Sequence, residues 1–112
     1  MEAIVVKRVS FDAAHFLPNY EGACRNMHGH HWVLEVGIRG KVRDDGMVVD
    51  FKVVKDILQP FINNFDHQLM NDTIENPTAE NIALYVKGKI KNVDGVEFVR
   101  VWETDENYAE VR

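Results

Sequence analysis

The residues best suited to chemistry lie close together near the start of the chain. His15, Cys24, His28 and His30 are all possible metal ligands, and they fall within one short stretch. Three neutral imidazoles are the ligand set of an open catalytic zinc site, which leaves a fourth position for water or substrate. A strand through His28 and His30 would project both side chains from one face. The alternative is three unrelated histidines near a buried cysteine, and the density of ligands favours a metal site.

Cys24 is the only cysteine in the chain, so no intrachain disulfide can form, which suits a reducing cytosol. Beside a metal site it has three possible roles. It could be a fourth zinc ligand, an inert buried thiol, or a catalytic thiolate that a nearby zinc ion and imidazole would stabilise.

Asp66 and His67 form a second candidate, at the end of an apolar helical pattern. An adjacent carboxylate can hold an imidazole in one orientation, so the two residues could act as a general acid/base pair. They could equally be a surface dipeptide or a local cap.

Glu103 is a third candidate, near the end of an apolar strand pattern over 96–103. A carboxylate there could accept two N–H bonds from a planar, amidine-like ring. A solvated glutamate at a strand end is the alternative.

Two strands are predicted to carry the histidines. Over 4–14 the sequence is rich in β-branched and aromatic residues, and its apolar positions share the odd parity of His15. Over 31–41 polar residues alternate with the apolar residues Trp32, Leu34, Val36 and Ile38. We expect these two strands to pair in antiparallel fashion.

The period of the pattern becomes helical after Asp50. Apolar residues predict a helix over 51–65 whose buried face comprises Phe51, Val54, Ile57, Leu58, Phe61, Ile62 and Phe65. Pro60 lies inside this pattern and should kink or shorten the helix. A second helix is expected to begin after Thr78, as its N-cap, and to run to Ile90.

A turn at 105–107 then leads from the strand over 96–103 into a short last strand that ends at Arg112. The whole pattern predicts one α+β domain spanning 1–112. Because so small an antiparallel sheet leaves open edges that must be covered or paired, we expect the chain to form a homo-oligomer.

Composition excludes some classes of function. The net charge of −5, without any basic block, argues against nucleic-acid binding. No apolar run is long enough to span a membrane, and the first residues lack the features of a secretory signal, so we expect a cytoplasmic protein without a membrane partner.

Taken together and in order, the motifs of this chain resemble the 6-pyruvoyltetrahydropterin synthase family, and within it most closely the 6-carboxytetrahydropterin synthase branch of queuosine and archaeosine precursor synthesis. The resemblance covers nearly the whole chain. The motifs are Phe11-Asp12-Ala13-Ala14-His15, Cys24-x-x-x-His28-Gly29-His30, Val49-Asp50-Phe51, Phe65-Asp66-His67, Pro77-Thr78-Ala79-Glu80-Asn81 and Trp102-Glu103-Thr104.

The resemblance implies the tunnelling fold (T-fold), in which β-β-α-α-β-β protomers close into a barrel as trimers and two trimers stack into a hexamer. It also implies that His15, His28 and His30 bind zinc (Zn2+). Cys24 is then not a zinc ligand and transfers protons. His31 has the opposite strand parity to His30 and is not expected to be a ligand.

The resemblance further implies that Asp66 and His67 transfer protons at a site on a neighbouring chain. Glu103 matches the carboxylate that binds the pterin ring in the family, and Thr78 matches a residue that lines the same pocket.

The implied reaction is that of a lyase acting on a pterin triphosphate. It converts 7,8-dihydroneopterin triphosphate to 6-carboxy-5,6,7,8-tetrahydropterin, with release of acetaldehyde and triphosphate. One alternative is the 6-pyruvoyltetrahydropterin synthase reaction, which eliminates triphosphate without cleaving the side chain. A second is a non-catalytic oligomer that binds zinc or pterin. The short chain and the Cys-Arg start of the zinc motif favour the carboxy branch.

Overall fold

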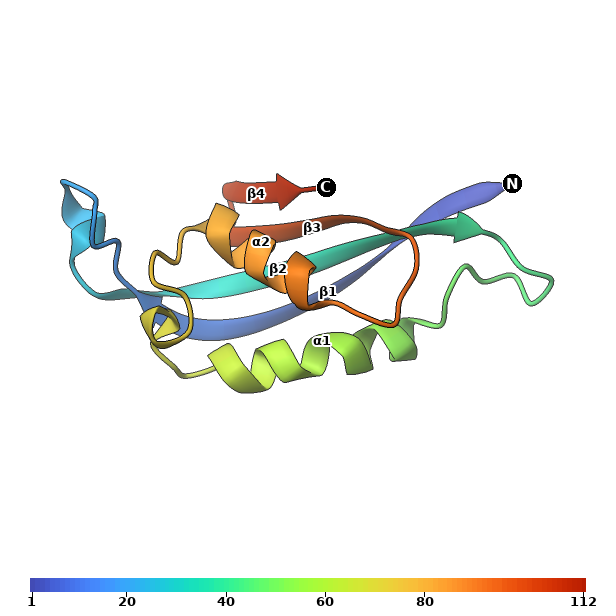
Figure 1. Cartoon of the computed structure of the whole chain (residues 1–112), viewed down its shortest axis with the longest axis horizontal. Helices are drawn as coiled ribbons and strands as arrows, with labels where there is room; N and C mark the ends of the chain where they lie inside the picture. The colour runs from blue at the N-terminus through green and yellow to red at the C-terminus, as the bar shows by residue number, and fades with distance from the viewer.

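A computed structural model describes the whole chain, residues 1–112. Its strands are β1 Glu2–His15, β2 His28–Lys41, β3 Val96–Thr104 and β4 Asn107–Val111, and its helices are α1 Phe51–Phe65 and α2 Ala79–Lys89. The strands form one antiparallel sheet in the order β1-β2-β3-β4, and the two helices cover one face of it (Figure 1). Short 3-10 helices, η1 Ala23–Arg25 and η2 Met70–Asp72, lie in the connections. The predicted α+β class and β-β-α-α-β-β order are confirmed.

β1 and β2 pair along their whole length, as predicted, and their alternation fixes which side chains face the helices. His15 pairs with His28, and Ala13 pairs with His30. The odd parity predicted for β1 is confirmed, because Phe11, Ala13 and His15 are all buried. β2 begins at His28, earlier than the predicted start at residue 31, because pairing with β1 continues through the histidine motif.

α1 begins at its N-cap Asp50, whose Oδ1 accepts a hydrogen bond of 2.9 Å from the N–H of Lys52. The predicted shortening at Pro60 is wrong, since the helix continues to Phe65. Pro60 is exposed, so the carbonyl that it leaves without a helical partner can be hydrated. The predicted burial of Phe51 is also wrong. Its side chain is 51% exposed, and the helix contributes buried core residues only from Val54 onward.

α2 begins where the sequence predicts it. Thr78 is its N-cap, with Oγ1 accepting a hydrogen bond of 3.1 Å from the N–H of Asn81. Such a cap contributes about 1 kcal/mol to helix stability. This helix packs on β3 and β4, whereas α1 packs on β1, so the two helices enclose a core against one face of the sheet.

The core ends at the histidine motif. The Trp32 side chain is fully buried, and its Nε1 donates a hydrogen bond of 3.2 Å to the carbonyl of Ala13. Its ring is nearly perpendicular to the rings of His15 and His30, with centroids 4.9 Å and 5.5 Å away. The imidazoles therefore extend an apolar core.

Several features of the fold bear on assembly. The molecule is elongated, at 52 × 23 × 22 Å, and its radius of gyration is 15.0 Å. A compact domain of this length would have a radius of about 13 Å. β1 and β4 are the outer strands of the sheet. Neither helix has the length and apolar character needed to cross a membrane.

Candidate functional site

Three imidazoles meet on the helix-covered face of the sheet, where β1 ends and β2 begins. One ring nitrogen from each of His15, His28 and His30 lies in a group whose members are all within 4.8 Å of one another. The two Nε2 atoms of His15 and His28 are 3.0 Å apart. The strand register brings the three together, because His15 faces His28 across the ladder and His30 is two residues further along the same face.

In two of the three rings, a hydrogen bond at Nδ1 determines that Nε2 faces the centre of the histidine cluster. His15 Nδ1 lies 2.8 Å from the carbonyl oxygen of Pro77, and His28 Nδ1 lies 2.7 Å from that of Asn26. A carbonyl only accepts, so Nδ1 donates in both rings, and in the neutral ring Nε2 carries the lone pair. Two lone pairs 3.0 Å apart repel unless a cation lies between them.

The third imidazole gives a second indication of a bound cation. His30 Nε2 is buried and has no hydrogen-bond partner. An unpaired buried nitrogen costs about 1–3 kcal/mol, and coordination would remove that cost. A carbonyl bond that fixes the ring of a ligand histidine is the usual arrangement around protein-bound metals. The three histidines therefore fit a zinc ion.

The protonation of the cluster also suits a metal. Burial lowers the pKa of His15, and the neighbouring His28 and His30 lower it further, against the opposing effects of the Pro77 carbonyl and the Glu103 carboxylate. Burial likewise lowers the pKa of His30, opposed by Glu103. Both rings are therefore neutral near pH 7, which is the form that binds metal.

Glu103, near the end of β3, lies beside this cluster. Its carboxylate oxygens are 3.8 Å from His15 Nε2 and 3.8 Å from His30 Nε2, and its side chain is 28% exposed. Glu103 therefore lies at the histidine cluster. It is not a fully solvated glutamate at a strand end, which was the alternative.

A cavity of about 710 Å³ adjoins Glu103. Its walls come from the loop after β1, the start of α2 and the β3–β4 hairpin, and include Tyr20, Thr78, Glu103 and Asn107. The Thr78 hydroxyl accepts the helix-capping bond and keeps its own hydrogen available to donate. Thr78 and Glu103, both singled out from the sequence, therefore share one cavity.

Cys24 lies in η1 and is half-buried. The carbonyl of this residue accepts a hydrogen bond of 2.9 Å from the N–H of Leu17, which ties the loop across its base. Its thiol is not a member of the group formed by the three histidines.

Asp66 and His67 follow α1 and lie along the outer edge of β1. Asp66 Oδ2 is 3.0 Å from His67 Nδ1, and Asp66 Oδ1 accepts a hydrogen bond of 3.0 Å from the N–H of Asp12. The Asp12 N–H, and then His67, lower the pKa of Asp66, so the carboxylate stays ionised. His67 has a φ of 59° and donates its own N–H to the Asp12 carbonyl at 2.7 Å. Its side chain is 79% exposed.

The sequence of the chain matches the family described as 6-pyruvoyl tetrahydropterin synthase over residues 4–112. The chain belongs to this family. A 6-carboxy-5,6,7,8-tetrahydropterin synthase of Synechocystis is 40% identical over 111 residues, covering 90% of this chain and 86% of that protein. A dihydroneopterin monophosphate aldolase of Pyrococcus furiosus is 36% identical, covering 95% of this chain and 94% of the relative.

The fold of the family agrees with the structure. The 6-pyruvoyl tetrahydropterin synthase of Caenorhabditis elegans superposes with a TM-score of 0.88 at 27% identity, covering 100% of this chain and 96% of the other. The protomer is therefore a T-fold, as the sequence predicts.

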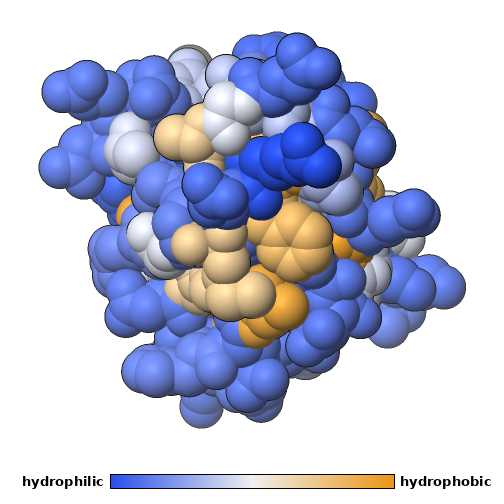
Figure 2. Space-filling model, turned by 90° about the vertical axis from the view of Figure 1, so that its left-hand side faces the viewer, coloured by the Kyte–Doolittle hydropathy of each residue, from blue (hydrophilic) through white to orange (hydrophobic).

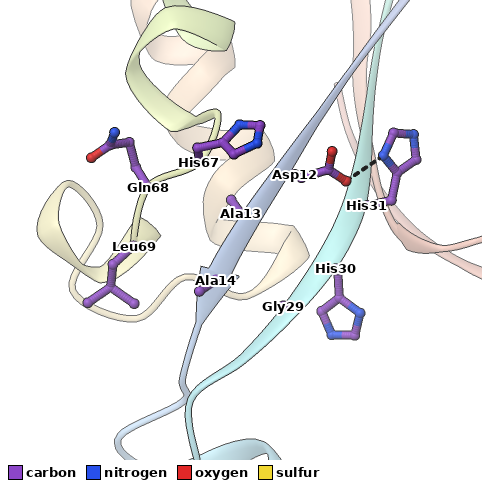
Figure 3. Close-up of a pocket in the computed structure, with 9 residues that line it drawn as sticks. All are labelled: Asp12, Ala13, Ala14, Gly29, His30, His31, His67, Gln68 and Leu69. Carbon is purple, nitrogen blue, oxygen red and sulfur yellow. Dashed lines mark hydrogen bonds and ion pairs between the residues drawn. The ribbon is translucent and has the colours of Figure 1, made fainter.

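Within this pterin synthase fold, sequence reasoning missed a second acid–imidazole pair. Asp12 Oδ1 lies 2.8 Å from His31 Nδ1, and both side chains are more than half exposed. Figure 3 shows this pair and His67 around one cavity, of about 570 Å³, with His30 pointing away. The strand register, in which Asp12 is opposite His31, could have revealed the pair.

Proposed function

We propose that this chain is a zinc-dependent, cytoplasmic 6-carboxytetrahydropterin synthase. It would convert 7,8-dihydroneopterin triphosphate to 6-carboxy-5,6,7,8-tetrahydropterin, releasing acetaldehyde and triphosphate, as a lyase of queuosine precursor synthesis. The observation that carries this proposal is the convergence of His15, His28 and His30, beside a cavity lined by Glu103 and Thr78. The 40% identity to a relative of that name supports the carboxy branch.

His15, His28 and His30 would hold the zinc through ring nitrogens, and the lowered pKa values of His15 and His30 keep those two rings neutral near pH 7. A zinc ion held there would supply Lewis-acid chemistry, which makes a substrate hydroxyl group more acidic. The buried wall formed by Trp32 limits the access of water from the core side.

Glu103 and Thr78 would hold the pterin ring in the adjoining cavity. The two carboxylate oxygens of Glu103 can accept paired N–H bonds from the amidine-like edge of the ring, a charge-assisted arrangement. The Glu103 carboxylate oxygens also lie 3.8 Å from the Nε2 atoms of His15 and His30. A pterin ring bound to Glu103 would therefore direct the side chain of the pterin toward the proposed metal position.

Cys24 and His67 would move the protons, through Sγ and Nε2 respectively. Asp66 engages Nδ1 of His67 at 3.0 Å, which leaves Nε2 as the nitrogen that faces outward to exchange a proton. The ionised state of Asp66 suits this orienting role.

The assembly would bring His67 to the metal site of a neighbouring chain. His67 is 79% exposed, and it shares a cavity with the outward-facing His31. Figure 2 shows hydrophobic side chains gathered in the middle of the end of the molecule that carries the histidine cluster. Exposed apolar patches of this kind mark interaction sites. The elongated shape, the outer edge of β4 and the part of the β1 edge that precedes Asp12 also support closure into trimers that stack as a hexamer.

A turnover assay with product identification tests the proposal. Incubating the zinc-loaded protein with 7,8-dihydroneopterin triphosphate should yield 6-carboxy-5,6,7,8-tetrahydropterin and an equal amount of acetaldehyde. Formation of 6-pyruvoyltetrahydropterin, with no acetaldehyde, would assign the chain to the other branch. Turnover only of dihydroneopterin monophosphate would favour the activity named for the Pyrococcus relative. Binding without turnover would indicate a non-catalytic protein.

A further inference from the structure

The three histidines are not held in the same way. His15 is fully buried, whereas His28 and His30 are partly exposed. His15 is also the last residue of β1, so strand pairing does not determine the path of the chain after His15. Other contacts must fix the backbone at this ligand.

One such contact is made by Asn71, from η2. The N–H of Phe16, the residue after His15, donates to Asn71 Oδ1 at 3.0 Å. Asn71 Nδ2 in turn donates to the Phe16 carbonyl at 2.9 Å. A side-chain amide thus satisfies both main-chain groups of Phe16, as a neighbouring strand would.

Asn71 completes a row of bonds along the outer edge of β1. Further up the strand, main-chain groups make these bonds: His67 N–H to the Asp12 carbonyl at 2.7 Å, and Ala14 N–H to the Gln68 carbonyl at 3.0 Å. From Met70 the backbone turns into η2, where the Met70 carbonyl accepts hydrogen bonds from the N–H groups of Thr73 and Ile74. The side chain of Asn71 therefore continues the row where the main chain no longer can.

A second asparagine acts on the ring of His15. The ring is oriented by the Pro77 carbonyl, which lies 2.8 Å from Nδ1. The loop that carries this carbonyl is held by Asn81, whose Nδ2 donates to the Asn76 carbonyl at 2.8 Å. Asn81 thus fixes the segment against which the imidazole is aligned.

We propose that Asn71 and Asn81 are positioning residues for the His15 ligand. Asn71 holds the backbone that follows His15, and Asn81 holds the carbonyl that orients its ring, so that Nε2 faces the other two histidines. The inference rests on the proposed metal centre. Loss of either contact should weaken zinc binding even where the three ligands are unchanged.

The test is zinc affinity, measured by competition with a chromophoric chelator. Asn71→Asp is the sharpest variant because it keeps the size and the acceptor for the Phe16 N–H, but faces the Phe16 carbonyl with an oxygen. Asn71→Asp, Asn71→Ala and Asn81→Ala should each bind zinc about 10–100-fold more weakly. Asn63→Ala is the matched control, since Asn63 is exposed on α1 and bonds only to Gln59, and it should bind like the parent chain.

Cobalt substitution separates positioning from a general structural role. Cobalt-saturated Asn71→Asp should show an altered ligand-field absorption spectrum, while Asn63→Ala keeps the parent spectrum. Parent affinity and spectrum in folded Asn71→Asp and Asn81→Ala would overturn the inference. Asn71→Asp and Asn81→Ala change separate segments of the chain. The two of them still test the inference if Asn71→Ala fails to fold. Absence of zinc binding by the parent chain would instead overturn the proposed metal centre.

Discussion

The chain carries two clusters of chemically competent side chains, and they differ in how complete they are. The histidine cluster lies on the buried face of the sheet, with Nδ1 of two rings already bonded to carbonyls and His15 fully buried. The Asp66–His67 pair lies on the outer edge of β1, where His67 is 79% exposed. The proposed metal position is preorganised within one chain, whereas the proposed acid–base pair is formed but faces open solvent. This difference is what the proposed shared site requires, in which a second chain completes the site.

The largest effect should come from the buried cluster. His15→Ala removes one of the three proposed ligands and the orienting bond to Pro77, so zinc content should fall from about one per chain to near zero and activity should be lost with it. Metal analysis and the turnover assay measure both. His31→Ala is the matched control, because His31 faces the opposite side of the sheet and its loss should leave zinc bound. Retention of stoichiometric zinc by His15→Ala would contradict the three-histidine site.

The next effect concerns the proton-transfer residues. Cys24→Ala and His67→Asn should lower kcat by about 10²–10⁴-fold, because each removes a group that we propose moves a proton. Zinc content and oligomeric size should not change in either variant. Loss of all zinc from Cys24→Ala would make the thiol a ligand, and that result would move Cys24 into the metal site.

A smaller effect is expected at the cavity that adjoins the cluster. Glu103→Gln keeps the size of the side chain but removes its charge and one of its two acceptors. Pterin binding should weaken by about 1.5–3 kcal/mol, measured as a fall in kcat/KM. Glu106→Gln, in the exposed β3–β4 turn, should have no such effect. Equal kinetics for the two variants would argue against Glu103 as the pterin anchor.

The smallest effect is on the stability of the metal-free protein. Burial lowers the pKa of His15 and His30 below the ordinary 6.5, so below that pH the unfolded chain binds protons that the folded chain does not. Stability should therefore fall as the pH drops from 6.5 toward the lowered pKa values, and should level off above 6.5. Thermal unfolding midpoints at about pH 7.5 and about pH 5.5 measure this, and His15→Leu should reduce the difference. A midpoint that rises on acidification would contradict the assignment.

The two clusters also differ in how far the sequence predicts them. Period-two alternation places His15, His28 and His30 on one face, and the structure brings them together. The contacts of the other cluster join residues far apart in the chain, such as Asp12 with Asp66, which no local pattern contains. The Asn71–Phe16 contact is hidden for the same reason.

Errors in the predicted elements have a similar origin. Pro60 removes one hydrogen bond from α1, but the carbonyl left unpaired can be hydrated because Pro60 is exposed, and the sequence does not reveal that exposure. Phe51 fits the helical spacing, but burial at that position depends on where α1 meets the sheet. The start of β2 depends on pairing that extends to His15. Spacing predicts the faces of the elements, whereas tertiary contacts determine their ends.

One measurement tests the central claim, that the metal of one chain and the acid–base pair of another form a shared site. Inactive Cys24→Ala protein is mixed with inactive His67→Asn protein, and subunit exchange is confirmed by mass analysis of the mixed oligomers. If a site draws Cys24 from one protomer and His67 from its neighbour, some sites in the mixture hold both intact residues and activity returns. No recovery after confirmed exchange would mean that each chain builds its own site, and the exposed Asp66–His67 pair would need another explanation.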